Sequence, residues 1–273
     1  MAERDLHPQS SGRLYGVGTG PGDPDLLTLK AARLLGQADV IAYFAKAGNA
    51  SNALRIVQAY RRDDVIEVPL LYPVTTESHR HGDAYRQAIT AFYDQMAAEL
   101  ARHLSDGRNV VVLSEGDPLF YGSYMHLHVR LASRFATEVV PGITAMSGCW
   151  SLAGLPIVQG DDVLTVLPGT LDEEELAQRL AATEAAIVMK IGRNLPKVRR
   201  ALARAGRLDC AVYVERGTMA EGRHLPLNRK TDDDAPYFSL VLVPGWAEQL
   251  AATDRSAEAH EANASADLEA STS

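Results

Sequence analysis

The 273-residue sequence is poor in several features that mark special classes of protein. Its two cysteines, Cys149 and Cys210, are too few and too far apart for a disulfide framework or a cysteine metal site. No apolar run approaches the roughly 18 residues that a membrane-spanning helix needs. The first residues, MAERDLHPQSSG, also lack the apolar core of a signal peptide. These absences predict a cytoplasmic protein without a membrane partner.

A strong charge of one sign is missing from the body of the chain. The net charge is −8, and five of these charges belong to residues 247–273, which hold six acidic side chains and one arginine. A nearly neutral body lacks the basic surface that nucleic-acid binding requires, so no nucleic-acid partner is expected. The polar residues 1–11 and the acidic, alanine-rich residues 247–273 have too few large apolar side chains to pack, which predicts disorder.

Short apolar strands alternate with helical patterns in the first half of the chain. The predicted strands are RLYGVG, DVIAYF, DVIEVPL, NVVVLSEGD and TEVVPG. This alternation predicts an α/β domain over residues 12–158, with a largely parallel sheet covered on both faces. The first helix is expected to cover PDLLTLKAARLLGQA, with Asp23 as its N-cap and Pro24 at its first position.

A second, smaller α/β domain is predicted over residues 161–245, after a break in the pattern at Pro156–Asp161. Its expected strands are DVLTVL, AAIVMKI, CAVYVERG and YFSLVLVPG, and its expected helices are Glu173–Ala182 and Leu195–Ala205. Two strands follow each other at the end of the chain without an intervening helix, so antiparallel pairing is expected there.

Four glycines alternate with other residues directly after the first strand: Gly16, Gly18, Gly20 and Gly22. They do not fit the G-x-G-x-x-G pattern of dinucleotide-binding proteins, because proline or aspartate stands where the third glycine is required. The remaining interpretations are a flexible turn or a loop whose glycines let the backbone approach a ligand closely.

Two more clusters follow later strands, where ligands of open parallel sheets bind. The first is SEGDPLFYGS, in which Glu115 and Asp117 could act as acid or base or could hold the amino group of an amino-acid-like ligand. The second, VVPGITAMSGCWSLAGLP, leads into a helix whose first N–H groups, from Ile143 to Ala145, could bind a carboxylate or a base edge.

Other constellations are weaker. The pairs His79/His81 and His126/His128 have a spacing that turns the two side chains apart on a helix, so no protein metal site is expected. Tyr121, Tyr124 and Met125 fit core or cleft lining better than catalysis.

The three clusters together resemble the tetrapyrrole methylase family, the class III S-adenosylmethionine methyltransferases. The matching stretches are GVGTGPGDPDLLTLKA, SEGDPLFYGS, PGITAMSG, AIVMKIGRNLPKV, YVERGT and YFSLVLV, which span about residues 13 to 243 in the order of the family. The resemblance implies two α/β domains, S-adenosyl-L-methionine in the cleft between them, and a homodimer. It also implies C-methylation of a tetrapyrrole on the route to cobalamin.

The resemblance implies a set of cofactor-binding residues as well. In this sequence they are Pro21, Glu115, Gly116, Asp117, Phe120, Thr144, Ala145, Met189 and Gly217. The catalytic base stays open between Asp117, Tyr121 and solvent.

The substrate implied by the resemblance carries several carboxylates, so cationic side chains should surround it. Lys46, Lys190 and Arg193 are candidates because each lies beside a strand end, although each could be an ordinary surface charge. The alternatives to this function are another methylase of the same fold, acting on a cobalt-bearing or later ring, and a non-catalytic tetrapyrrole-binding module.

Overall fold

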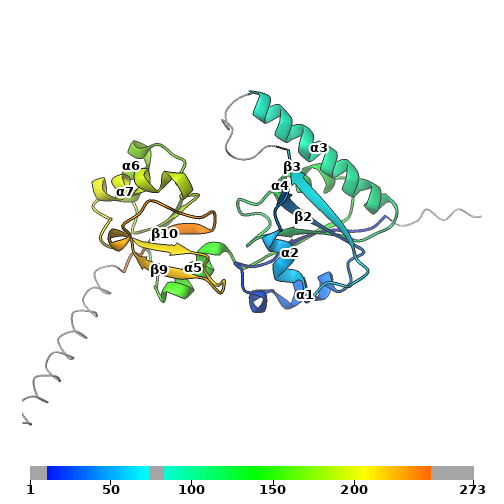
Figure 1. Ribbon diagram of the computed structural model, residues 1–273, viewed down its shortest axis with the longest axis horizontal. Helices are drawn as coiled ribbons and strands as arrows, with labels where there is room; N and C mark the ends of the chain where they lie inside the picture. The colour runs from blue at the N-terminus through cyan, green and yellow to red at the C-terminus, as the bar shows by residue number, and fades with distance from the viewer. Residues whose placement is uncertain (1–10, 74–82, 247–273) are drawn as a thin grey trace, which may run out of the picture. The chain divides into compact units, whose positions relative to one another are not determined.

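The computed structural model describes residues 11–73 and 83–246 (Figure 1). They form two compact units. The first contains the residues up to Gly148 together with Thr218–Ala220, and the second contains Cys149–Gly217 and the residues from Glu221 onward. The units therefore divide earlier than the break at Pro156–Asp161, and the domain limits 12–158 and 161–245 stay a prediction. The expected disorder of the tails falls almost wholly outside the described residues.

The first unit is built on one parallel sheet. Its strands are β1 (Leu14–Gly18), β2 (Val40–Lys46), β3 (Ile66–Tyr72), β4 (Val110–Ser114) and β5 (Thr137–Val140). Their order in the sheet is β3-β2-β4-β1-β5, and all the pairs are parallel. The five predicted strands and their parallel arrangement are confirmed.

Helices cover both faces of this sheet. The helices are α1 (Leu29–Leu35), α2 (Asn52–Val57), α3 (Asp83–Ser105) and α4 (Tyr124–Leu131). On β4, Val110 and Val112 pack with α3 and α4, whereas Val111 and Leu113 pack with α1 and α2. Because successive side chains of a strand point to opposite faces, a wholly apolar strand must be covered on both sides. The long helix α3 runs along one face of the sheet (Figure 1).

The first predicted helix is wrong in its start. Asp23 does act as an N-cap, since its side chain accepts a hydrogen bond from the Asp25 N–H, but it caps only a 3₁₀ turn over Pro24–Leu26. The chain then becomes extended, and α1 begins afresh after Thr28, whose hydroxyl accepts from the Ala31 N–H. A threonine cap stabilises a helix start by about 1 kcal/mol, which favours this second start over one continuous helix.

The second unit has a mixed sheet. Its strands are β6 (Leu164–Pro168), β7 (Ala185–Met189), β8 (Val212–Glu215), β9 (Arg223–Pro226) and β10 (Ser239–Val243). The order is β6-β7-β10-β8-β9, with β6 and β7 parallel and all the other pairs antiparallel. The helices α6 (Glu173–Ala181) and α7 (Leu195–Arg204) pack on one face, and α5 (Ala145–Ala153) spans the division between the units. The predicted antiparallel strands are confirmed.

The prediction missed β9, a strand of four residues at the edge of this sheet. Its sequence is Arg-His-Leu-Pro, which has neither alternation nor the β-branched residues that identify a strand. Its pairing with β8 comes from tertiary context. Among the described residues, no helix is long and apolar enough to cross a membrane.

Candidate functional site

Three loops of the first unit meet at the carboxyl ends of the adjacent strands β4, β1 and β5. A Cβ on Gly18 would lie 2.6 Å from the Gly116 carbonyl oxygen and 2.6 Å from the Gly142 nitrogen. A Cβ on Gly142 would lie only 2.0 Å from the same carbonyl oxygen. Contacts this short are impossible for a side chain, so glycine is required for the three backbones to come together. The structure thus brings together the three sequence clusters.

The first and second loops are also hydrogen-bonded to each other. The Gly116 N–H donates to the Gly20 carbonyl at 2.8 Å, and the two residues form an antiparallel bridge. Both glycines have left-handed φ values, +75° and +66°, which other residues adopt only at a cost. The buried Thr19 donates from its N–H and its hydroxyl to the Ser114 carbonyl. The first loop is therefore a defined structure, which counts against the flexible turn.

Asp117 braces the second and third loops. One carboxylate oxygen accepts a hydrogen bond from the Leu119 N–H at 2.9 Å, and the other accepts from the Gly142 N–H at 3.1 Å. Because both oxygens already accept backbone donors, this carboxylate is badly placed to receive a proton from a substrate. This geometry fits a role for Asp117 in holding the second and third loops together.

Glu115 has a different environment from Asp117. Its side chain is accessible to solvent, but the surrounding protein displaces water from the carboxyl group, and this raises the pKa of Glu115. A hydrogen bond from Asn52 lowers the pKa and offsets only part of that rise. Asn52 is the first residue of α2, so this contact ties the second loop to another element of the same unit. A carboxylate with a raised pKa gains from a cationic partner, such as the ammonium group of an amino acid.

The third loop presents backbone donors. The N–H groups of Ile143, Thr144 and Ala145 donate to no acceptor within residues 11–73 and 83–246. Thr144 caps the amino end of α5, because its hydroxyl oxygen accepts a hydrogen bond from the Ser147 N–H at 3.4 Å. Open N–H groups at a helix start suit a carboxylate or the edge of a base.

The aromatic residues of the second loop divide into two kinds. Tyr124 is fully buried, and its ring fills the space where Gly16 has no side chain, so it belongs to the core as expected. Phe120 lies edge to face against Tyr121 with ring centroids 4.9 Å apart. Tyr121 has a φ of +55°, an unusual value for a bulky residue and one that clusters at functional sites.

The predicted residues of the second unit lie at the carboxyl ends of two of its strands. Met189 ends β7, and Gly217 follows β8 by two residues. Because β7 and β8 are both antiparallel to β10, they run in the same direction, and their carboxyl ends lie at the same end of the sheet. Gly217 contacts Cys149 so closely that a Cβ would lie 2.6 Å from the sulfur. Burial raises the pKa of the Cys149 thiol to about 12, so this cysteine is a packing residue.

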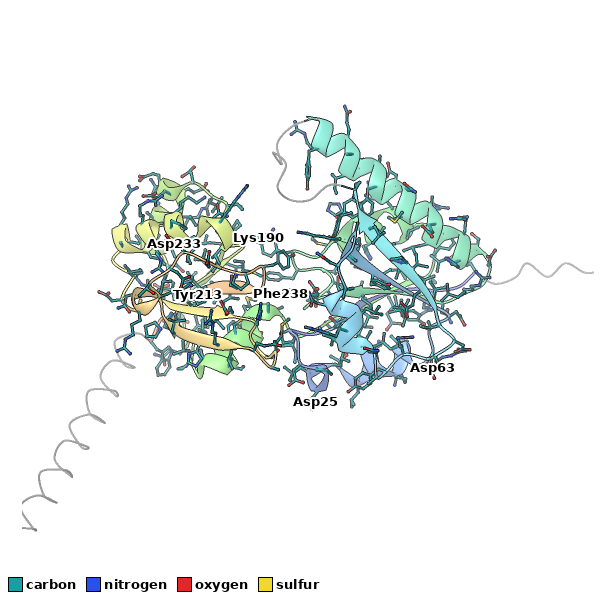
Figure 2. The ribbon with its side chains drawn as sticks, viewed as in Figure 1. Asp25, Asp63, Lys190, Tyr213, Asp233 and Phe238 are labelled. Carbon is teal, nitrogen blue, oxygen red and sulfur yellow. The ribbon has the colours of Figure 1, made fainter. Side chains whose placement is uncertain are left out.

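The three cationic candidates are exposed at strand ends. Lys46 is the last residue of β2, Lys190 directly follows β7, and Arg193 lies in the 3₁₀ turn Gly192–Asn194. Lys190 has a left-handed φ of +56°. Figure 2 labels its side chain. Lys190 and Arg193 are neighbours on one turn, and Lys46 belongs to the other unit.

The prediction missed Thr218 and Met219, which belong to the first unit although the residues on either side belong to the second. The Thr218 hydroxyl accepts a hydrogen bond from the Asp23 N–H at 3.3 Å, and Met219 packs over Gly22. The one signal in the sequence for a role of Thr218 is its position next to Gly217. Within the same described ranges no group of three His, Cys, Asp or Glu could hold a metal ion.

A buried polar network lies just before these residues. Glu215, at the end of β8, accepts hydrogen bonds from the Tyr213 hydroxyl at 2.5 Å and the Arg223 Nε at 2.7 Å. Burial alone would raise the pKa of Glu215, but the two hydrogen bonds outweigh it, and the net direction is downward. Tyr213 lies in the interior of the second unit (Figure 2). The network holds the end of β8 from which the chain enters the turn Arg216–Thr218.

Comparison with known proteins gives consistent matches. A family model described as Tetrapyrrole (Corrin/Porphyrin) Methylases matches residues 13–230. A precorrin-2 C(20)-methyltransferase of Sinorhizobium sp is 67% identical over 87% of this chain and 97% of its own length. A cobalt-precorrin-2 C(20)-methyltransferase of Salmonella typhimurium strain LT2 is 30% identical over 85% of this chain and 96% of its own.

Among solved structures, a uroporphyrin-III C-methyltransferase of Thermus thermophilus in complex with S-adenosylhomocysteine superimposes with a TM-score of 0.60. It is 25% identical, and the match covers 85% of this chain and 96% of that one. The predicted fold of two α/β domains is confirmed.

Proposed function

Because the chain belongs to the tetrapyrrole methylase family, we propose that it is the S-adenosylmethionine-dependent enzyme that methylates precorrin-2 at carbon 20, giving precorrin-3A in cobalamin biosynthesis. The observation that carries this proposal is the 67% identity to a precorrin-2 C(20)-methyltransferase over nearly the whole of both chains. The predicted family and enzyme class are confirmed.

The residues of the first unit fit the cofactor chemically. S-adenosylmethionine has an ammonium group, a carboxylate and an adenine edge, so its site needs an acceptor and several donors close to backbone. Glu115 offers an acceptor, the loop from Ile143 to Ala145 offers donors, and the glycines at 20 and 116 leave the backbone open to close approach. Pro21, Gly116, Phe120, Thr144 and Ala145 complete the proposed site in this unit, with Asp117 as the brace.

Met189 and Gly217 of the second unit are proposed for the same ligand. Both residues lie at the carboxyl ends of β7 and β8, which supports this proposal because the loops that follow strands of the same direction lie at the same end of the sheet. Lys46, Lys190 and Arg193 are proposed to attract the substrate carboxylates, and their exposure at strand ends supports the proposal.

The chain's contribution to the reaction is alignment and exclusion of water. When bound, S-adenosylmethionine supplies an electrophilic methyl group on a sulfonium. The ring carbon of a partly reduced tetrapyrrole is enamine-like and already nucleophilic. Rigid loops that hold two reactants in line can contribute on the order of 7–11 kcal/mol of the barrier. Asp117 serves this rigidity. The proton left on the methylated carbon goes to solvent, either directly or through the Tyr121 hydroxyl, which gives its own proton to water as it accepts.

Two same-fold substrates remain to be separated, precorrin-2 and its cobalt-bearing form. The relative named for precorrin-2 is more than twice as identical to this chain as the one named for cobalt-precorrin-2, which favours the metal-free ring. A homodimer and a cytoplasmic location are also proposed. The described cysteines, Cys149 and Cys210, are both free thiols, which supports a reducing compartment.

The decisive experiment is anaerobic incubation of the protein with S-adenosylmethionine and enzymatically generated precorrin-2, followed by mass spectrometry and NMR. One added methyl at carbon 20, with release of S-adenosylhomocysteine, is expected. A parallel incubation uses cobalt-precorrin-2, and a methylated product from this ring but not from precorrin-2 would favour the cobalt-bearing substrate. Binding of the rings without methylation of either would favour a non-catalytic module. Replacing Arg193 with alanine should raise the KM for the ring and leave cofactor affinity unchanged; unchanged ring kinetics would remove Arg193 from the site.

A further inference from the structure

A short segment directly after Gly217 packs into the first glycine loop. Thr218–Ala220 belongs to the first unit, whereas the chain on both sides of it belongs to the second. The chain thus leaves the second unit for three residues and then returns. Such a local excursion orders three residues, so the contacts that they make must offset that entropy.

The contacts of Thr218 are specific. Its hydroxyl accepts a hydrogen bond from the Asp23 N–H at 3.3 Å, at the end of the first loop. The same residue has a φ of +68°, and Arg216, two residues earlier, has a φ of +49°. Left-handed φ values are costly for threonine and arginine, so two of them flanking a glycine indicate a turn that is held by its surroundings.

Two glycines make room for this segment. A Cβ on Gly22 would lie 2.5 Å from the Met219 Cγ, and Gly22 itself has a φ of +145°. A Cβ on Gly148, in α5, would lie 2.9 Å from the Thr218 methyl and 2.8 Å from the Pro21 Cβ. Pro21 and Thr218 therefore pack side by side on the bare backbone of Gly148.

We infer that Thr218 is a positioning residue of the cofactor site, which fixes the first loop through the Asp23 backbone and presses it, with Pro21, against Gly148 of α5. This role rests on the proposed function, since Pro21 and Gly217 are proposed cofactor residues and Thr218 links them. The side chain acts through the loop and does not itself need to touch the ligand.

The test compares Thr218→Val with Thr218→Ser in the full-length protein. Valine keeps the methyl group and puts a second methyl in place of the hydroxyl, whereas serine keeps the hydroxyl and loses the methyl. Thr137→Val is the matched control, because the Thr137 hydroxyl also bonds to backbone, at the amino end of β5 in the same sheet. The measurements are the Kd for S-adenosylhomocysteine by calorimetry, steady-state kinetics, and amide exchange at Asp23.

Thr218→Val should weaken S-adenosylhomocysteine binding about 3- to 10-fold, the range expected for one hydrogen bond. It should raise the KM for S-adenosylmethionine similarly, leave the KM for the ring within about twofold, and speed amide exchange at Asp23. Thr218→Ser should restore most of the affinity. Gly148→Ala tests the same packing from the other side and should also weaken cofactor binding.

Three results with the variants would overturn the role. The first is a folded Thr218→Val variant with the affinity of the unmodified protein. The second is a serine variant as weak as the valine variant, which would show that the hydroxyl is not responsible. The third is a loss in Thr137→Val equal to that in Thr218→Val, which would show a general effect on stability in place of a specific role. If the unmodified protein itself failed to bind S-adenosylhomocysteine, the proposed function would fall and this role with it.

Discussion

The two sheets place their strand ends differently, and the site follows that difference. All the strands of the first sheet are parallel, so every carboxyl end lies at one edge, and three neighbouring loops converge there. In the second sheet β10 and β9 run against the others, so only β6, β7 and β8 end at a common edge. A parallel sheet thus offers more loops to one ligand than a mixed sheet of the same size.

The two regions are also built from different chemistry. Glycine and backbone hydrogen bonds form the loops of the first unit, with Asp117 as a brace. In the second unit, the buried side chains of Glu215 and Tyr213, together with the exposed Arg223, form the hydrogen bonds at the end of β8. Substitutions that fill space should therefore damage the first region most, and substitutions that remove polar partners should damage the second.

The largest effect is expected for Gly142→Ala. Its Cβ would lie 2.0 Å from the Gly116 carbonyl oxygen, a backbone atom that cannot move without separating two loops. We expect a loss of S-adenosylhomocysteine affinity of more than about tenfold and a fall in the free energy of unfolding of about 1–3 kcal/mol. Calorimetric titration and denaturant unfolding would measure the two quantities.

Gly36→Ala is the matched control, since Gly36 has a φ of −70° and the nearest atoms to its Cβ are 3.7 Å away. It should change neither quantity appreciably. Equal behaviour of the two variants would contradict the close approach of the loops.

The second effect concerns Glu215 in the other sheet. Glu215→Gln weakens the hydrogen bonds from Tyr213 and Arg223 and should lower the free energy of unfolding by about 1–3 kcal/mol at neutral pH. The folded-state pKa of Glu215 lies below its ordinary value of 4.5, so its contribution is present above that value and is lost as the pH falls through the lowered pKa. Denaturant unfolding between neutral and acidic pH would show a shallower acid dependence in the glutamine variant.

Glu174→Gln serves for comparison, because Glu174 pairs with Arg204 on the exposed surface. Its effect at neutral pH should be much smaller than that of Glu215→Gln, because water and salt screen an exposed ion pair. If it destabilised as much as Glu215→Gln, burial would not be what makes the Glu215 network important.

A smaller effect is expected from the titration of Glu115. The raised pKa means that this group becomes protonated at a pH where an ordinary glutamate is still ionised. Binding of a ligand with an ammonium group should therefore weaken as the pH falls through the raised value, and Glu115→Gln should remove that dependence. Calorimetry with S-adenosylhomocysteine from neutral to acidic pH would detect it; Asp63→Asn, at an exposed loop of the same unit, should leave the dependence in place.

The smallest effects should come from one helix cap in each unit. Thr28 caps α1 and Asp172 caps α6, each through a hydrogen bond to the N–H three residues on. Alanine at either position should cost about 1 kcal/mol of stability and leave S-adenosylhomocysteine affinity unchanged. A loss of affinity in only one of them would show that the helix concerned supports the site.

Much of the fold could be predicted because its signals are local. The strands β1, β4 and β5 of the first sheet lead into clusters of glycine, proline or acidic residues, and the order of these clusters contributes to the family resemblance. What failed depended on context: the restart of α1 at Thr28, and β9, which pairs although its residues do not favour a strand.

The loops of the candidate site could be predicted from the sequence, but the side-chain contacts that hold these loops in place could not. Glycine clusters after strands point to close approach, and the structure brings Gly18, Gly116 and Gly142 together. The brace at Asp117 and the contact of Thr218 with Asp23 join residues far apart in the chain, and a single sequence has no signal for such pairs. The sequence left Asp117 open between an acid or base and a ligand-binding residue, and its two backbone donors are visible only in the structure.

The outermost strands of both sheets have a consequence for behaviour at high concentration. β3 contains Pro69, β6 ends in Pro168, β9 ends in Pro226, and β5 is only four residues long and is followed by Pro141. Proline has no N–H to donate, so β3, β6 and β9 each lack one of the backbone donors that a strand from another molecule would pair with, and β5 offers only a short row of them. We therefore expect these described edge strands to pair poorly with strands of other molecules.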